Sequence, residues 1–231
     1  MKRLVIIGEG HGEVSALPLL AKKILLEKKV ERRLWVDEEI VRAHNPSGLV
    51  KWDREKKEPE CGEWLKRIRF AANRSNLGGI LAIFDGDAER FPAGAQSAFC
   101  AKTAAKLMAK EAAKEGAGTR YSLAIVFACV EYESWLIAGA ESLAGKTFKD
   151  GRPILPKDSN FPDGPSESHG KRWLEKHCLS GYRSRRDQGP LTELVDLAVV
   201  RSKGLRSFFR LDHAIEQILD AVDNNVCIVT P

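Results

Sequence analysis

Short apolar runs alternate with amphipathic stretches along the first 140 residues. The runs at 4–7, 80–84 and 121–129 are almost entirely apolar, which is typical of strands buried on both faces. A further strand with a weaker pattern is predicted over residues 35–43. Helices are predicted over residues 13–29, 62–73, 95–115 and 131–140. This alternation predicts an α/β fold with a mostly parallel sheet flanked by helices, of the Rossmann-like kind.

The pattern changes after Gly139, where Gly, Pro, Asp and Ser become frequent. Residues 145–170 are predicted to form a long irregular connection, and residues 45–60 a loop or insertion. Helical patterns alone follow, over residues 167–178, 191–199 and 207–222. We therefore predict an α/β domain over residues 1–140 and a helical region over 141–231 that packs on the same domain. Residues 224–231 are predicted to form either a short strand or a disordered end.

The overall composition is that of a globular protein. The 231 residues are 43% hydrophobic and 30% charged, and the net charge is +5, which is compatible with a partner rich in phosphate. Five widely spaced cysteines lack the C-x-x-C spacing of a zinc or redox site, which predicts reduced thiols. The first apolar run is too short for a signal peptide, and no stretch has the length of a membrane span. We expect a cytoplasmic protein without a membrane partner.

Acidic side chains follow three of the predicted strands. Glu9 follows the first strand, Asp85 and Asp87 follow the run at 80–84, and Glu131 and Glu133 follow the last strand. Glu13 comes four residues after Glu9, at the start of a helix. Ligands of parallel sheets collect at the carboxyl ends of the strands, so these carboxylates are expected to converge there.

Converging carboxylates repel one another, at a cost of about 4 kcal/mol for two unit charges 4 Å apart near a protein surface. A bound cation relieves this repulsion, and oxygen-only ligands favour Mg²⁺ or Mn²⁺. Glu9, Glu13, Asp85 and Asp87 are therefore predicted to bind metal. Each residue alone has a simpler interpretation as a helix cap or a loop charge. The choice between Glu131 and Glu133 as a further ligand or general base stays open, because the two point in different directions on a helix.

The arrangement of these residues resembles the TOPRIM fold. TOPRIM domains carry a Glu after the first strand and an Asp-x-Asp after a later one. The segment Glu9-Gly10-His11-Gly12-Glu13 is similar to the nuclease branch of the overcoming-lysogenization-defect (OLD) type, and Asp85-Gly86-Asp87 matches the Asp-x-Asp. The stretch from Cys129 to Leu136 resembles an acidic-Trp-Leu motif of uncharacterised bacterial relatives, and residues 202–208 resemble a second motif of the domain of unknown function family DUF4276.

This resemblance implies a Mg²⁺- or Mn²⁺-dependent nuclease, or a related phosphodiester-processing protein, with a possible place in bacterial defence beside a partner ATPase. It implies that Glu9, Asp85 and Asp87 hold one ion, that Glu13 helps to place a second, and that Glu131 or Glu133 completes the catalytic set. We expect nucleic acid as the partner and an enzymatic role.

Basic residues offer two candidate contacts for a nucleic acid. Tyr182, Arg183, Arg185 and Arg186 form a predicted loop, which is interpreted either as a nucleic-acid contact or as surface decoration. The lysines spaced four residues apart between 102 and 114 are interpreted as a solvated helix face.

Two other functions compete with the nuclease hypothesis. One is a different phosphotransfer enzyme that uses Asp85 and Asp87, although a haloacid-type phosphatase would place this motif after its first strand. The other is a noncatalytic module that binds metal or nucleic acid. The sequence lacks Gly-x-Ser-x-Gly and a complete Walker loop, and His169, His177 and Cys178 lack a fourth ligand at zinc spacing. His11, between the two glutamates, is a candidate for substrate contact.

Overall fold

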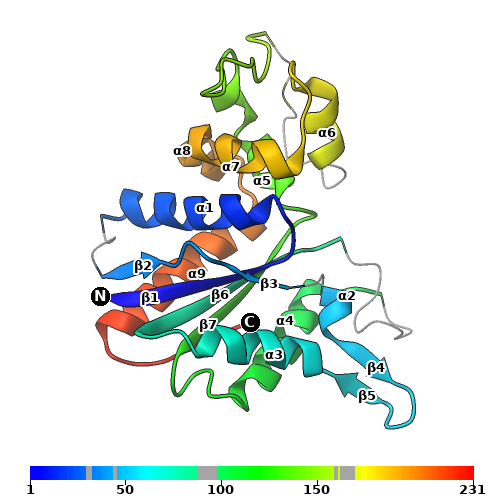
Figure 1. Ribbon diagram of the computed structural model, residues 1–231, viewed down its shortest axis with the longest axis vertical. Helices are drawn as coiled ribbons and strands as arrows, with labels where there is room; N and C mark the ends of the chain where they lie inside the picture. The colour runs from blue at the N-terminus through cyan, green and yellow to red at the C-terminus, as the bar shows by residue number, and fades with distance from the viewer. Residues whose placement is uncertain (30–32, 44–45, 88–97, 159–160, 162–169) are drawn as a thin grey trace.

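A parallel β-sheet lies at the centre of the computed structural model (Figure 1). The structure describes residues 1–29, 33–43, 46–87, 98–158, 161 and 170–231. The sheet strands are β1 (Lys2–Gly8), β2 (Leu34–Val36), β3 (Val41–Arg42), β6 (Leu77–Asp85), β7 (Ser122–Ala128) and β8 (Val229–Thr230). Their order is β2-β1-β6-β7-β8, and β3 continues the edge of β1 beyond β2. Each of these pairings is parallel, which confirms the predicted α/β class.

Helices cover both faces of the sheet. Figure 1 shows α1 and α9 on one face and α3 and α4 on the other, with α5 to α8 stacked beyond α1. Their bounds are α1 Glu13–Glu27, α3 Gly62–Ala72, α4 Ala101–Ala113, α5 Glu133–Ala138, α6 Gly170–His177, α7 Ser184–Leu194, α8 Leu197–Ser202 and α9 Arg206–Asp223. A 3₁₀ turn, η1 (Ala140–Leu143), follows α5.

Two hydrophobic layers explain why the strands are apolar throughout. Along β1, Leu4 and Ile6 face the layer of α1 and α9, while Val5 and Ile7 face the layer of α3 and α4. The central strands β6 and β7 alternate in the same way. Because successive side chains point to opposite faces and both faces are covered, the polar residues of these strands are confined to their ends, such as Lys2, Asp85 and Ser122.

The structure refines several predicted boundaries. The predicted strand over 35–43 is two short strands, β2 and β3, separated by the acidic segment that weakened the prediction. The predicted loop over 45–60 contains α2 (Pro46–Leu49) and an antiparallel hairpin of β4 (Lys51–Asp53) and β5 (Glu58–Glu60). The Asp53 side chain accepts hydrogen bonds from the backbone N–H groups of Glu55 and Lys56, which turns this charged run back on itself.

The predicted helix over 191–199 is wrong in its bounds. The segment is the end of α7 and the start of α8, with a break at Val195 and Asp196. The Asp196 carboxylate caps α8 by accepting the N–H of Ala198 at 2.8 Å, and Lys23 of α1 donates to carbonyls at the end of α7. The tail forms the short strand β8, which pairs with β7. Residues 95–97 and 167–169 of two predicted helices lie outside the described residues.

Candidate functional site

The acidic residues meet at the carboxyl ends of the three central strands. Glu9 follows β1, Asp85 is the last residue of β6, and Glu133 opens α5 just after β7. Glu13 completes the group because it is the first residue of α1, which begins at the end of the short loop that leaves β1. These four side chains, from Glu9, Glu13, Asp85 and Glu133, are called the acidic cluster below.

Two glycines allow the loops around the acidic cluster to approach neighbouring backbone. A Cβ atom at Gly86 would lie 2.6 Å from the carbonyl oxygen of Ala128, at the end of β7. A Cβ atom at Gly12 would lie 2.7 Å from the carbonyl oxygen of Ser184 and would overlap the Gln188 side chain. The first contact sets the turn after β6, and the second packs the β1–α1 loop against the start of α7. Larger residues at either position would push the acidic cluster apart.

Hydrogen bonds tie the carboxylates to the backbone of these loops. One oxygen of Glu13 accepts the N–H groups of Glu9 and Gly10, at 2.8 and 3.2 Å. One oxygen of Glu9 accepts the N–H of Asp85 at 2.8 Å, so the ends of β1 and β6 are joined through a side chain. One oxygen of Asp85 in turn accepts the N–H of Tyr132 at 2.8 Å. The chain of contacts runs from α1 through β1 and β6 to the segment after β7.

Glu131 and Glu133 have separate environments. The Glu133 side chain is buried and accepts a hydrogen bond from the Tyr182 hydroxyl at 2.7 Å. Its charge raises the pKa of Asp85, and the charges of Glu131 and Glu13 raise its own pKa, so it belongs to the acidic cluster. Glu131 instead accepts the backbone N–H of Lys171, at the start of α6, at 2.7 Å. The geometry therefore places Glu133, and not Glu131, with the other carboxyl groups of the acidic cluster.

Burial is the main cause of the raised pKa values of the four carboxyl groups in the acidic cluster. Burial raises the pKa of Glu9 to about 8, although the N–H of Asp85 lowers it, and the charges of Glu13 and Asp87 raise it further. Burial also holds the pKa of Asp85 well above its usual range, with added repulsion from Glu13, Glu9 and Glu133. The pKa values of Glu13 and Glu133 are likewise raised, again chiefly by burial.

No lysine or arginine of the described ranges lies within ion-pair distance of these four carboxylates. The acidic cluster is therefore a concentration of carboxyl oxygens whose ionisation is opposed by burial and mutual repulsion and is not relieved by a described basic side chain. That donor set suits a hard divalent cation. Its side chains are turned toward backbone N–H groups, and the part of the chain that the structure describes contains no ready-made set of three ligands around one point. Binding an ion would require some of these side chains to rotate.

The structure brings the predicted residue Asp87 only to the rim of the acidic cluster. Asp87 is exposed, two residues beyond the end of β6, and its charge acts on Glu9. The residues that follow, 88–97, lie outside the described part of the chain. Asp87 thus lies at the solvent side of the acidic cluster, close enough for its charge to act on Glu9.

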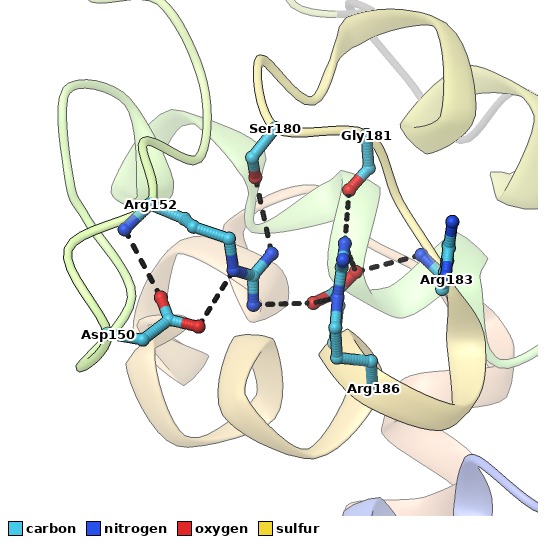
Figure 2. Close-up of polar contacts among 7 residues, drawn as sticks. Asp150, Arg152, Ser180, Gly181, Arg183 and Arg186 are labelled. Carbon is cyan, nitrogen blue, oxygen red and sulfur yellow. Dashed lines mark hydrogen bonds and ion pairs between the residues drawn. The ribbon is translucent and has the colours of Figure 1, made fainter.

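The predicted nucleic-acid loop, Tyr182 to Arg186, is partly helical, and its tyrosine is buried. Tyr182 is buried against Glu133 and so does not offer a ring to an external base. Arg185 and Arg186 lie on α7 rather than on a loop, and the Arg186 guanidinium is bound to Asp187 and to the carbonyl of Gly181 (Figure 2). Arg183 and Arg185 remain exposed. Periodicity did not reveal this helix because its first turn holds three charged residues and no apolar one.

Two contributors to the site carried no clear sequence signal. The backbone N–H of Tyr132 binds Asp85, and the buried Tyr132 hydroxyl pairs with Thr192 of α7 at 2.7 Å. Arg42, the last residue of β3, contacts His11 in the loop between Glu9 and Glu13. A single arginine in a weak strand pattern, such as Arg42, is too common to indicate a site. A backbone N–H, such as that of Tyr132, is present in nearly every residue and so leaves no signal in the sequence.

The fold and the acidic cluster define an α/β protein with a polar site at the carboxyl edge of its parallel sheet. A family model described as a domain of unknown function, DUF4276, matches residues 8–216, and the chain belongs to this family. No curated protein and no solved structure matches the chain. In the described part of the chain, no helix is both long and apolar enough to cross a membrane.

Proposed function

We propose that this protein is a divalent-metal-dependent nuclease or a closely related phosphodiester-processing enzyme. The observation that carries the proposal is the acidic cluster itself, in which Glu9, Glu13, Asp85 and Glu133 converge with raised pKa values and without a basic partner among the described residues. A fold rarely keeps unpaired buried carboxylates unless they serve a site. The resemblance of the Glu9 and Asp85 motifs to TOPRIM nucleases supports this choice of chemistry.

Glu9 and Asp85 are the central ligands in this proposal. Both lie at strand ends and are joined through the Asp85 N–H, so their relative position is set by the sheet. Asp87, at the solvent side, and Glu13, at the start of α1, would complete the ligand set. When bound, Mg²⁺ or Mn²⁺ would supply Lewis-acid activation of a phosphodiester and of water.

Glu133 is proposed as the group that accepts or holds a proton. Its pKa is raised chiefly by burial, and the Tyr182 hydroxyl fixes one of its oxygens. A carboxyl group whose pKa lies nearer neutrality is better suited to proton transfer than an ordinary carboxylate. Glu131 would act only through Glu133, as a nearby charge, because its own oxygen is held by Lys171.

The test combines metal binding with turnover. The wild-type protein is compared with Glu9→Gln and Asp85→Asn, and with Glu193→Gln as a control for an exposed carboxylate. We expect Mg²⁺ or Mn²⁺ to raise the Tm of the wild type and of the control, by an amount equivalent to about 2.7 kcal/mol at a hundredfold excess over Kd. Neither site variant should respond. Labelled DNA and RNA are incubated with the same proteins, and cleavage should be lost in both site variants.

Each outcome separates the hypotheses. Cleavage that survives in Glu9→Gln and Asp85→Asn would reject the acidic cluster as the active site. A metal-induced rise in Tm without cleavage of either nucleic acid would favour the noncatalytic binding module, or an activity that requires a partner ATPase. Release of inorganic phosphate from phosphomonoesters, with no cleavage of nucleic acid, would favour the alternative phosphotransfer enzyme.

A further inference from the structure

Arg42 and His11 form a polar pair beside the acidic cluster. The Arg42 guanidinium lies 3.1 Å from Nε2 of His11, and both side chains are exposed. Arginine has only donors, so Nε2 of His11 accepts this hydrogen bond and the imidazole proton lies on Nδ1. The contact joins the end of an edge strand to the glycine-rich loop between Glu9 and Glu13.

The sheet register determines where this pair lies relative to the acidic cluster. Arg42 is the parallel partner of Gly8, and the N–H of Ala43 donates to the Gly8 carbonyl at 2.8 Å. Strand β6, which carries Asp85, pairs with β1 on the opposite side. The loop that begins with Glu9 is therefore flanked by Arg42 on one side and by Asp85 on the other.

The Arg42 guanidinium retains capacity for a ligand. It has five N–H donors, and His11 uses one of its nitrogens. Among the described residues, no carboxylate forms an ion pair with Arg42, in contrast to Arg3, Arg152 and Arg201, which all pair with aspartates. A planar guanidinium whose remaining donors have no partner among the described residues suits a phosphate group, which it can bind through two parallel hydrogen bonds.

We propose that Arg42, oriented by His11, binds a backbone phosphate of the nucleic-acid substrate next to the acidic cluster. This inference rests on the proposed function, because it assigns the anchor for that same substrate. Any charge on the carboxyl groups of the acidic cluster repels a phosphate, and Arg42 supplies an opposite charge beside the loop that begins with Glu9. Arg42 thereby replaces the segment from Tyr182 to Arg186 as the leading contact for nucleic acid.

The test measures binding and metal response separately. Binding of a short labelled DNA oligonucleotide, single-stranded and duplex, is measured at several salt concentrations for Arg42→Gln, Arg42→Lys and His11→Ala. Lys106→Gln, which removes one exposed positive charge from α4, is the matched control. Arg185→Gln tests the earlier candidate. The metal-induced shift in Tm is recorded for each protein without DNA.

We expect Arg42→Gln to weaken binding about tenfold, because it removes charge-assisted hydrogen bonds. The slope of log K against log salt should fall by about 1. Arg42→Lys should recover the salt slope but only part of the affinity, since it keeps the charge and loses the fork. His11→Ala should have a smaller effect, and the metal-induced Tm shift should be unchanged in all three variants.

Two results would overturn the inference. One is Arg42→Gln binding like Lys106→Gln, or Arg185→Gln causing the larger loss. The other is a wild-type protein that binds neither oligonucleotide even at low salt. A loss in Arg42→Gln together with no metal response in the wild type would keep the anchor and reject the proposed metal-dependent activity, so the two failures can be told apart.

Discussion

Asp187 and the acidic cluster have opposite electrostatic environments. Asp187, at the start of α7, is fully buried and surrounded by donors, from Arg186, from Arg152 and from the N–H of Arg183 (Figure 2). Burial alone would raise its pKa, but these hydrogen bonds outweigh burial and hold the pKa below its ordinary value. In the acidic cluster, burial dominates and the pKa values rise.

The difference shows what each group does for the molecule. The ion pair between Arg152 and Asp187 ties the irregular segment near Arg152 to helix α7, which packs along α1. It is satisfied internally and stabilises the fold. The acidic cluster is only partly satisfied by backbone N–H groups, and it costs stability as long as its charges remain unbalanced. Within one chain, a carboxylate is thus paired with arginines in one place, while carboxyl groups in another place have no described basic partner.

The largest expected effect is at Asp187. Asp187→Asn removes the charge that two arginines share, and the free energy of unfolding should fall by about 3 kcal/mol. Urea unfolding at neutral pH, followed by circular dichroism, measures this change. Arg152→Gln should cause a smaller loss, because Arg186 and the Arg183 N–H remain to hold Asp187. An Asp187→Asn protein as stable as the wild type would contradict the structural role.

Glu9→Gln should have the opposite sign in metal-free protein. The pKa of Glu9 is about 8 in the folded state and 4.5 as its ordinary value, so the folded state binds more protons between these values. Stability of the wild type should therefore fall as pH rises from about 5 to about 8, and Glu9→Gln should remove part of that fall. At pH 8 we expect the variant to be more stable by about 1 kcal/mol.

Thermal unfolding across this pH range, in chelator, measures the effect of Glu9→Gln. Adding Mg²⁺ or Mn²⁺ should stabilise the wild type most at the alkaline end, because metal and proton compete for the same carboxylates. A wild-type protein that becomes less stable on acidification from pH 8 to pH 5 would contradict the balance of charges described for the acidic cluster.

The smallest effect is expected from Tyr182→Phe. The Tyr182 hydroxyl lowers the pKa of Glu133, against the larger effect of burial, so its removal should raise that pKa further. The pH dependence of any nucleic-acid cleavage should then shift to higher pH, with a loss of stability of about 0.5 kcal/mol. Tyr121→Phe, which removes a tyrosine hydroxyl that donates to the backbone carbonyl of Glu115 and not to a carboxylate, is the matched control and should leave the pH profile unchanged.

Much of the fold is determined by local sequence patterns. The apolar runs that became β1, β6 and β7, and the amphipathic stretches of α1, α3 and α9, have the periodicity of their elements. The positions of Glu9 and Asp85 at strand ends also follow from those patterns, because parallel strands place their carboxyl ends together. The sequence alone therefore groups the motif residues at one edge of a sheet.

The tertiary structure alone decided the partners of each charge. The sequence could not distinguish Glu131 from Glu133, since both follow β7, and only the packing of α5 buries Glu133 beside Asp85. Tyr182 and Arg42 reach the site from segments more than thirty residues from any motif that they contact. Whether a buried carboxylate is neutralised, as at Asp187, or left unbalanced, as at Glu9, depends on the three-dimensional positions of distant arginines. Periodicity fixes which face a residue lies on, but electrostatic energy depends on distance and burial.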